Sequence, residues 1–154
     1  MHNKSLHRNF ATLSFVKTRE YSRKAFEKES SMNKLNGICP HIPSSNPEVT
    51  KAFFCELLGF NVAFQHNNYI ELEKDGHFIG IQQSQGKPNQ QSIYLRLEGL
   101  NEFWESQKEK LSNYKHREPF EQEYGMRELH VIVPETATLL FIGESVNAPT
   151  RRSS

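Results

Sequence analysis

The sequence predicts an α+β fold built from two βαβββ modules, and three observations support this prediction. Residues 46–60 read as a short amphipathic helix with both ends marked by suitable capping residues. The pair Asp75-Gly76, the strongest short signal for a β-hairpin, separates two strand-like runs. The same order of elements then recurs after residue 91, at a spacing of about 50 residues. Such a repeat indicates two equivalent half-structures within one domain.

The first helix is defined by its two ends. Asn46 is a good N-cap, Pro47 suits the first turn, and Gly59 is the usual left-handed terminator. Apolar residues at helical spacing predict one buried face, made of Val49, Ala52, Phe53 and Leu57. An extended segment, 37–42, precedes this helix, and strands are expected at 60–65, 69–73 and 77–82.

The second module follows the polar loop 84–91. Alternation predicts a strand at 92–97, and apolar spacing predicts a helix at 100–111. Three further strands are expected at 117–122, 126–133 and 138–142. We therefore expect modules at 36–83 and 92–144 within one domain, 36–146.

The two ends of the chain differ from its middle in charge. The first 36 residues carry 8 basic and 3 acidic side chains, whereas residues 37–146 carry 9 basic and 15 acidic ones. We interpret 1–35 as a basic, disordered extension and 147–154 as a flexible tail. An organellar address or a nucleic-acid arm is the alternative for the extension.

Composition excludes several classes of protein. No apolar run reaches the roughly 20 residues of a membrane span, and no signal-peptide core is present, so a cytoplasmic protein without a membrane partner is expected. An acidic body favours cationic ligands and disfavours nucleic acid. Cys39 and Cys55 form no CxxC pair, which predicts reduced thiols.

Strand alternation assigns residues to two faces of each predicted sheet. If Ile70 and Leu72 face the helix, Tyr69 and Glu71 face the opposite side. The same argument in the second module places Tyr94, Glu128 and His130 on the side away from the core. An ordinary solvated sheet face is the alternative, but tyrosines and carboxylates on one face favour a ligand surface. Phe64 has no predicted face, because the length of the turn at 66–68 decides its parity.

These patterns resemble the vicinal oxygen chelate superfamily, which includes glyoxalase I, extradiol dioxygenases, fosfomycin-resistance enzymes and bleomycin resistance proteins. The resemblance covers residues 37–145, is closest to the bleomycin resistance branch, and is carried by residues 39–46, 53–60, 94–104, 124–128 and 139–141. One departure is Val133-Pro-Glu-Thr136, where the family usually has Asp-Pro-Asp-Gly. The resemblance implies the glyoxalase/bleomycin resistance fold, with curled mixed sheets around a cleft. It also implies a homodimer whose two chains together form two grooves, with residues 36–42 as a plausible exchanged arm.

The resemblance also locates the positions at which metal-dependent members place His and Glu ligands. Here these positions fall on Cys39, Ser92 and near Ile81 and Leu140, a poor set for a hard divalent cation. His41, His77 and His130 show no HxH or HxxxH spacing. We therefore predict no metal, no cofactor and no catalytic residue.

The resulting prediction is a metal-free binding protein that sequesters a cationic aromatic compound. By resemblance, this ligand is an antibiotic of the bleomycin type, and binding confers resistance. The predicted ligand-binding residues are Tyr69, Glu71, Tyr94, Glu128, His130 and His41. A metal-dependent enzyme of the same superfamily, such as a lyase, dioxygenase or thiol transferase, is the alternative, and a basic-armed nucleic-acid module is a third interpretation.

Overall fold

The computed structural model describes residues 34–146. Residues Met1–Asn36 and Gly37–Ser154 form separate units, and the fold lies in the second unit. The predictions of a disordered extension and a flexible tail fall almost entirely on residues 1–33 and 147–154, which lie outside the described residues.

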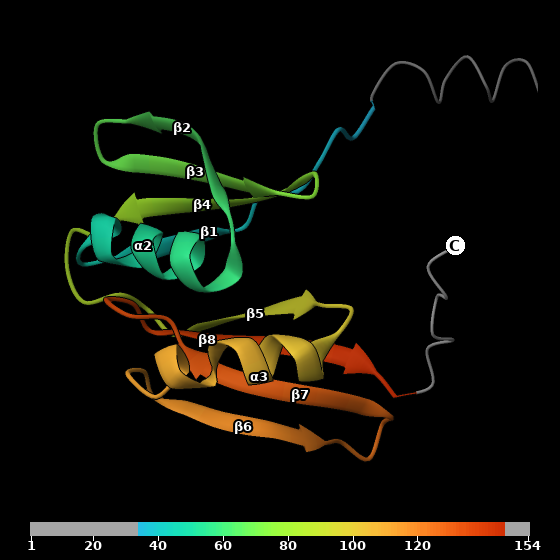
Figure 1. Ribbon diagram of the computed structural model, residues 1–154. Helices are drawn as coiled ribbons and strands as arrows, with labels where there is room; N and C mark the ends of the chain where they lie inside the picture. Colours follow the sequence, from blue (N-terminus) through green and yellow to red (C-terminus); the bar gives the residue numbers. More distant parts are fainter. Residues whose placement is uncertain (1–33, 147–154) are drawn as a thin grey trace, which may run out of the picture. The chain divides into compact units, whose positions relative to one another are not determined.

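The first module is a four-stranded mixed sheet covered by one helix. Its sheet order is β1-β4-β3-β2; β1 runs parallel to β4, and the other neighbours are antiparallel. Figure 1 shows α2 lying along one face of this sheet. The elements are β1 (His41–Ser44), α2 (Pro47–Leu58), β2 (Asn61–His66), β3 (Tyr69–Lys74) and β4 (His77–Gln83).

The second module repeats this arrangement. Its sheet order is β5-β8-β7-β6, again with one parallel pair, β5 with β8. The elements are β5 (Gln91–Arg96), α3 (Leu100–Leu111), β6 (His116–Glu121), β7 (Met126–Ile132) and β8 (Thr138–Ser145). The prediction of an α+β fold with two βαβββ modules is therefore confirmed.

The two local turn signals have the expected backbone. Gly59 ends α2 in the left-handed region, with φ of 71°, and its N–H donates to the carbonyl of Cys55. Asp75 and Gly76 both have positive φ, 51° and 78°, as a tight hairpin turn requires. Asn46 is the N-cap residue, but its side chain makes no capping hydrogen bond.

The buried face of α2 differs from the prediction. Val49 is 41% exposed, whereas Thr50 is fully buried. The Thr50 hydroxyl lies 2.8 Å from Ser44 Oγ and donates to the carbonyl oxygen of Pro134 at 2.9 Å. These partners satisfy a polar side chain that apolar periodicity alone leaves out of the core.

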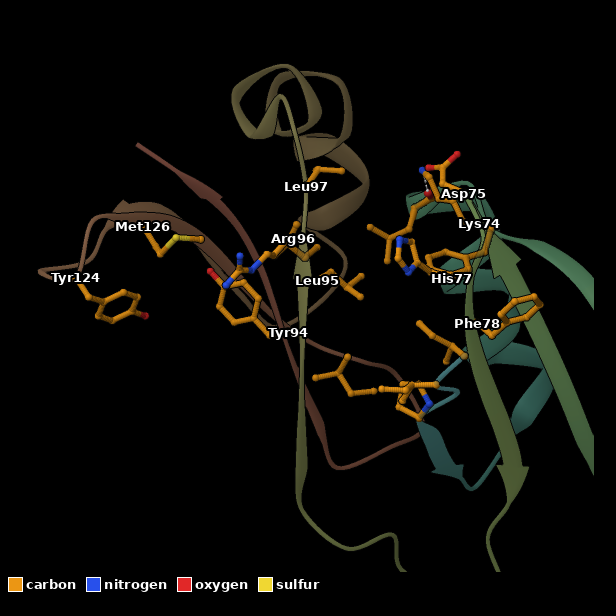
Figure 2. A pocket seen from close by; sticks show the side chains of 17 residues that line it. Lys74, Asp75, His77, Phe78, Tyr94, Leu95, Arg96, Leu97, Tyr124 and Met126 are labelled. Atoms are coloured by element: carbon orange, nitrogen blue, oxygen red, sulfur yellow. Dashed lines mark hydrogen bonds between the residues drawn. The ribbon is translucent and has the colours of Figure 1, made fainter. Parts of the chain in front are cut away.

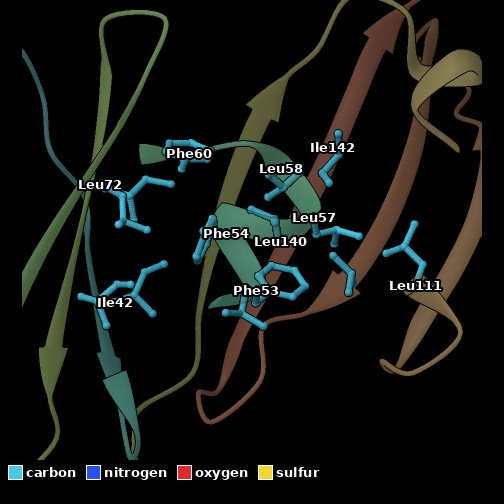
Figure 3. Packing of buried hydrophobic residues seen from close by; sticks show 14 of the residues in the cluster. Ile42, Phe53, Phe54, Leu57, Leu58, Phe60, Leu72, Leu111, Leu140 and Ile142 are labelled. Atoms are coloured by element: carbon cyan, nitrogen blue, oxygen red, sulfur yellow. The ribbon is translucent and has the colours of Figure 1, made fainter. Parts of the chain in front are cut away.

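Both modules contribute to one hydrophobic core. Figure 3 shows Phe53 and Phe54 of α2 among side chains of both sheets. The Phe53 ring meets Tyr114, which follows α3, edge-on at 5.0 Å. The turn that departs from the family pattern also joins the modules, because the N–H of Ser45 donates to the carbonyl of Glu135 at 2.8 Å. Glu135 has a φ of 61°, so this contact holds a non-glycine residue in the left-handed region.

Candidate functional site

Each sheet has one face packed on the core and one open face, as the alternation predicts. Ile70 and Leu72 are buried at 2% and 0% exposure, while Tyr69 and Glu71 point the other way and are half-buried. We call the side of the first sheet that carries His41, Phe64, Tyr69, Glu71 and Gly80 the first open face. The corresponding side of the second sheet carries Tyr94, Arg117, Phe120, Glu128, His130, Phe141 and Gly143, and we call it the second open face.

On the first open face, a tyrosine and a glutamate of β3 pair with each other. Tyr69 donates its hydroxyl to Oε2 of Glu71 at 3.0 Å, and Cys39 Sγ lies 3.9 Å from both groups. The ring of His41, on β1, lies 5.3 Å from that of Tyr69. Burial raises the pKa of Tyr69, and so does its hydrogen bond to Glu71. The tyrosine therefore stays a neutral donor at any ordinary pH.

The structure places Phe64 on the first open face, whereas the sequence did not decide on which face this residue lies. The turn between β2 and β3 has two residues, and the register shifts between Val62 and Phe64, so Phe64 lies opposite Glu71. Its ring is 54% exposed and lies 6.4 Å from that of Tyr69. This adds an accessible aromatic ring to the predicted set.

On the second open face, Glu128 is fully buried beneath four hydrogen-bond donors. Its Oε1 accepts the hydroxyls of Tyr94 at 2.9 Å and Tyr124 at 2.6 Å. Its Oε2 lies 2.8 Å from both the Gln122 amide nitrogen and His130 Nε2. Every good acceptor position of this carboxylate is therefore occupied by the protein itself.

This network determines the charge state of Glu128. Burial by itself raises the pKa of the carboxyl, but the hydrogen bonds from His130, Tyr124, Gln122 and Tyr94 together lower it to about 2. Burial and the bond to Glu128 raise the pKa of Tyr94 to about 12. The side chain of His130 is 17% exposed. Glu128 is therefore an ionised, satisfied group rather than an open counter-charge.

Two strand glycines that the sequence analysis did not single out make room for these tyrosines. Gly80 on β4 pairs with Glu71, and Gly143 on β8 pairs with Glu128. A Cβ at Gly80 would lie 2.7 Å from His41 Cδ2, and one at Gly143 would lie 1.9 Å from the Tyr94 hydroxyl. In a sequence, an isolated glycine within a strand-like run indicates such a close approach of another group to the backbone.

The two last-strand residues near which the resemblance locates metal ligands do not face an open side of the sheets. Ile81 and Leu140 are fully buried on the core side, so neither reaches an open face. The open-face neighbours along these strands are Gly80 and Gln82 on β4, and Phe141 and Gly143 on β8. Within residues 34–146, no three His, Cys, Asp or Glu side chains are placed to hold a metal ion.

A cavity of about 700 Å³ lies between the modules, beside the outer edge of β5. Its lining is mainly apolar and includes Ile38, Leu58, Ile93 and Leu97. Figure 2 shows Tyr94, Arg96, Tyr124 and Met126 on one side and Lys74, Asp75, His77 and Phe78 on the other. Of the six predicted ligand-binding residues, Tyr94 alone lines this cavity.

No helix in the described part of the chain is long and apolar enough to cross a membrane.

Solved structures share this fold. A bleomycin-binding protein in complex with bleomycin aligns with a TM-score of 0.63 at 24% identity, over 72% of this chain and 99% of that one. A bleomycin resistance determinant encoded on transposon Tn5 aligns with 0.61 at 23% identity, over 72% and 98%. A lactoylglutathione lyase from Agrobacterium tumefaciens reaches 0.61 at 9% identity, over 73% and 96%.

No family model matches the sequence, and no curated protein matches it. The structural likeness nevertheless shows the fold. The chain has the glyoxalase/bleomycin resistance fold, as the sequence resemblance implied.

Proposed function

We propose that this protein binds a cationic aromatic compound, of the bleomycin type, and confers resistance by sequestering it. Binding is stoichiometric and metal-free, and no bond is made or broken. The observation that carries the proposal is the first open face, where accessible rings surround a carboxylate that retains an unoccupied oxygen. The structural likeness to a bleomycin-binding protein in complex with bleomycin supports this choice of ligand.

The first open face offers both contacts that such a ligand requires. Planar groups stack on the rings of Phe64, Tyr69 and His41. Within residues 34–146, the hydrogen bonds to Glu71 all reach Oε2, which leaves Oε1 for a ligand donor. A charge-assisted hydrogen bond to this oxygen offsets the positive charge of the ligand.

The remaining predicted residues contribute in a different way. Tyr94 is 40% exposed, so its ring is accessible for stacking even though its hydroxyl is bound to Glu128. Glu128 and His130 hold that hydroxyl and the neighbouring rings in place. We therefore assign Glu128 a positioning role instead of direct contact with the ligand.

The chemistry of the open-face residues disfavours the superfamily's metal-dependent reactions. Glycine, glutamine and phenylalanine occupy the open face of β4 and β8 near Gly80, Gln82 and Phe141, and they offer no carboxylate to a divalent cation. Metal analysis of the purified protein separates the two functions. One tightly held divalent ion per chain would contradict the binding-only proposal.

We also propose that the protein is a homodimer, as the resemblance implies. Ile38 and Tyr124, at the cavity, are 76% and 66% exposed, which is apolar surface that a second chain can cover. β5 also has no strand partner on its outer edge in the described part of the chain. Sedimentation equilibrium tests this: wild type should be dimeric, and Ile38→Asp should shift it toward monomer. A monomeric wild type would overturn the dimer.

Calorimetric titration with copper-free bleomycin tests the proposed ligand. Saturable heat with one ligand per chain is the expected result. No heat at roughly tens of micromolar protein would remove bleomycin as the ligand while leaving the fold assignment intact.

A further inference from the structure

We propose that the second open face binds a planar aromatic group that carries a negative charge, such as an aryl carboxylate or sulfonate. This inference deepens the proposed function, and it rests on that function only in treating the open faces as ligand surfaces. It gives the two faces opposite charge preferences, so that a ligand spanning both would carry a cationic and an anionic end.

Four aromatic rings cross the second sheet, one from each strand. The Tyr94 ring on β5 stacks on Phe141 of β8, with centroids 6.0 Å apart and planes 9° apart. Phe141 meets His130 of β7 edge-on at 4.4 Å, and His130 meets Phe120 of β6 edge-on at 4.9 Å. This continuous row offers a flat ligand several stacking positions.

The carboxylate in this row is closed to a ligand cation. Glu128 has no exposed side-chain surface, and each of its oxygens already accepts two hydrogen bonds. An incoming ammonium or guanidinium would have to displace one of those donors and leave it unpaired, which is unfavourable. A cation therefore gains no direct contact with Glu128, unlike with Glu71 on the first open face.

The exposed charges along the row are positive. The Arg117 guanidinium carbon lies 3.4 Å from the Phe120 ring centroid, and the side chain is exposed. Arg96 lies two residues beyond Tyr94 on the same face of β5 and is also exposed (Figure 2). Neither arginine forms an ion pair with any described residue, although Glu118 directly follows Arg117. A guanidinium stacked on a ring keeps its in-plane N–H donors free for an anion.

Two small probes with one ring system and opposite charges test this inference: 2-naphthalenesulfonate and 2-naphthylmethylammonium. Gly143 lies beneath the second open face and Gly80 beneath the first, so their backbone amide signals report binding at each face by NMR. We expect the sulfonate to shift the Gly143 signal saturably and to bind there at least about fivefold more tightly than the ammonium.

Arg117→Gln is the diagnostic variant, and Arg127→Gln is its matched control. Arg127 lies on the same sheet, but it faces the other side and donates to Asn101. Arg117→Gln should weaken sulfonate binding at Gly143 about tenfold, on the scale of one charge-assisted hydrogen bond, and Arg127→Gln less than about twofold. Tighter binding of the ammonium at Gly143, equal effects of the two variants, or no shift with either probe would each overturn the inference.

This test is independent of the antibiotic. If copper-free bleomycin fails to bind while the sulfonate result holds, the proposed ligand is wrong and the charge preference of the second open face stands. If bleomycin binds and the sulfonate does not, the reverse is true.

Discussion

The two open faces contain the same three residue types, a tyrosine, a glutamate and a glycine, but their glutamates differ in burial and in hydrogen bonding. In each, a tyrosine hydroxyl donates to a glutamate that pairs across the sheet with a glycine: Tyr69 with Glu71, and Tyr94 with Glu128. Glu71 is half-buried and accepts hydrogen bonds through one carboxylate oxygen only. Glu128 is fully buried, and its two oxygens accept hydrogen bonds from four donors. The equivalent positions of the two modules can therefore differ in role: Glu71 remains available to a ligand, whereas Glu128 stabilises the folded protein.

The connections between strands explain this difference. In the second module, the segment joining β6 and β7 supplies Gln122 and Tyr124, both of which donate to Glu128. In the first module, β2 and β3 are joined by a two-residue turn, Asn67 and Asn68. This short turn has no side chain placed to complete a similar network around Glu71.

Removing the two carboxylates should have the most unequal effects. Glu128→Ala removes a buried carboxylate that accepts four hydrogen bonds, and it leaves the half-buried donors of Gln122 and His130 without an acceptor. We expect it to lower the free energy of unfolding by about 3 kcal/mol. Glu71→Ala, whose partners can reach water, should cost about 1 kcal/mol or less. Urea denaturation measures both values, and similar losses would contradict the distinction between the faces.

Acid should reveal the contribution of the ionised Glu128 to stability. The folded pKa of Glu128, about 2, lies below its ordinary value of 4.5, so its stabilising contribution is complete above about pH 4.5 and disappears as the pH falls toward 2. The urea midpoint of wild type should therefore fall more between pH 6 and pH 3 than that of Glu128→Gln. Parallel curves for the two proteins would show that Glu128 does not titrate as described.

Substituting the two strand glycines, Gly143 and Gly80, compares how tightly the two open faces are packed. Gly143→Ala forces the Tyr94 ring away from Glu128 and should cost about 2 kcal/mol of stability by overpacking. Gly80→Ala crowds both His41, which is exposed and can move, and the Tyr69 ring, but the contacts of 2.7 and 2.9 Å are longer than the 1.9 Å contact at Gly143. About 1 kcal/mol is therefore expected. Thermal or urea unfolding ranks the two variants, and a larger loss for Gly80→Ala would reverse our assignment of the more tightly packed face.

Stacking on the first open face is tested by ligand affinity instead of stability. Tyr69→Ala should weaken the binding of copper-free bleomycin by roughly 1 to 2 kcal/mol, the scale of an aromatic contact. Tyr114→Phe, on the core side, provides the control because it keeps the ring that packs on Phe53. Unchanged affinity in Tyr69→Ala would place the groove elsewhere.

Local chemistry explains which features the sequence could predict. Helix ends, the Asp75-Gly76 turn and strand parity depend on residues close in the chain, and the structure bears them out except for the missing capping hydrogen bond of Asn46. Thr50 was missed because its hydroxyl donates to the carbonyl of Pro134, which is far along the chain. Phe64 required a turn length and a register shift that the residues alone do not specify.

The open faces were predictable as surfaces but not in their roles. Parity placed Glu71 and Glu128 correctly away from the helices, yet their opposite burial depends on donors brought together by tertiary structure. Gly80 was visible as an isolated glycine in a predicted strand, whereas Gly143 lies just beyond the predicted end of the last strand at residue 142. The tyrosines above both glycines could be identified only in three dimensions.

The most direct test of ligand binding at the first open face compares two charge-neutralising variants in a calorimetric titration with copper-free bleomycin. Glu71→Gln removes the accessible carboxylate, and Glu73→Gln makes the same change two residues away, where the carboxylate accepts the N–H of Gly76 in the hairpin turn. We predict about tenfold weaker binding for Glu71→Gln and less than about twofold for Glu73→Gln. Equal affinity of Glu71→Gln and wild type would contradict the claim that the first open face holds the ligand's positive charge.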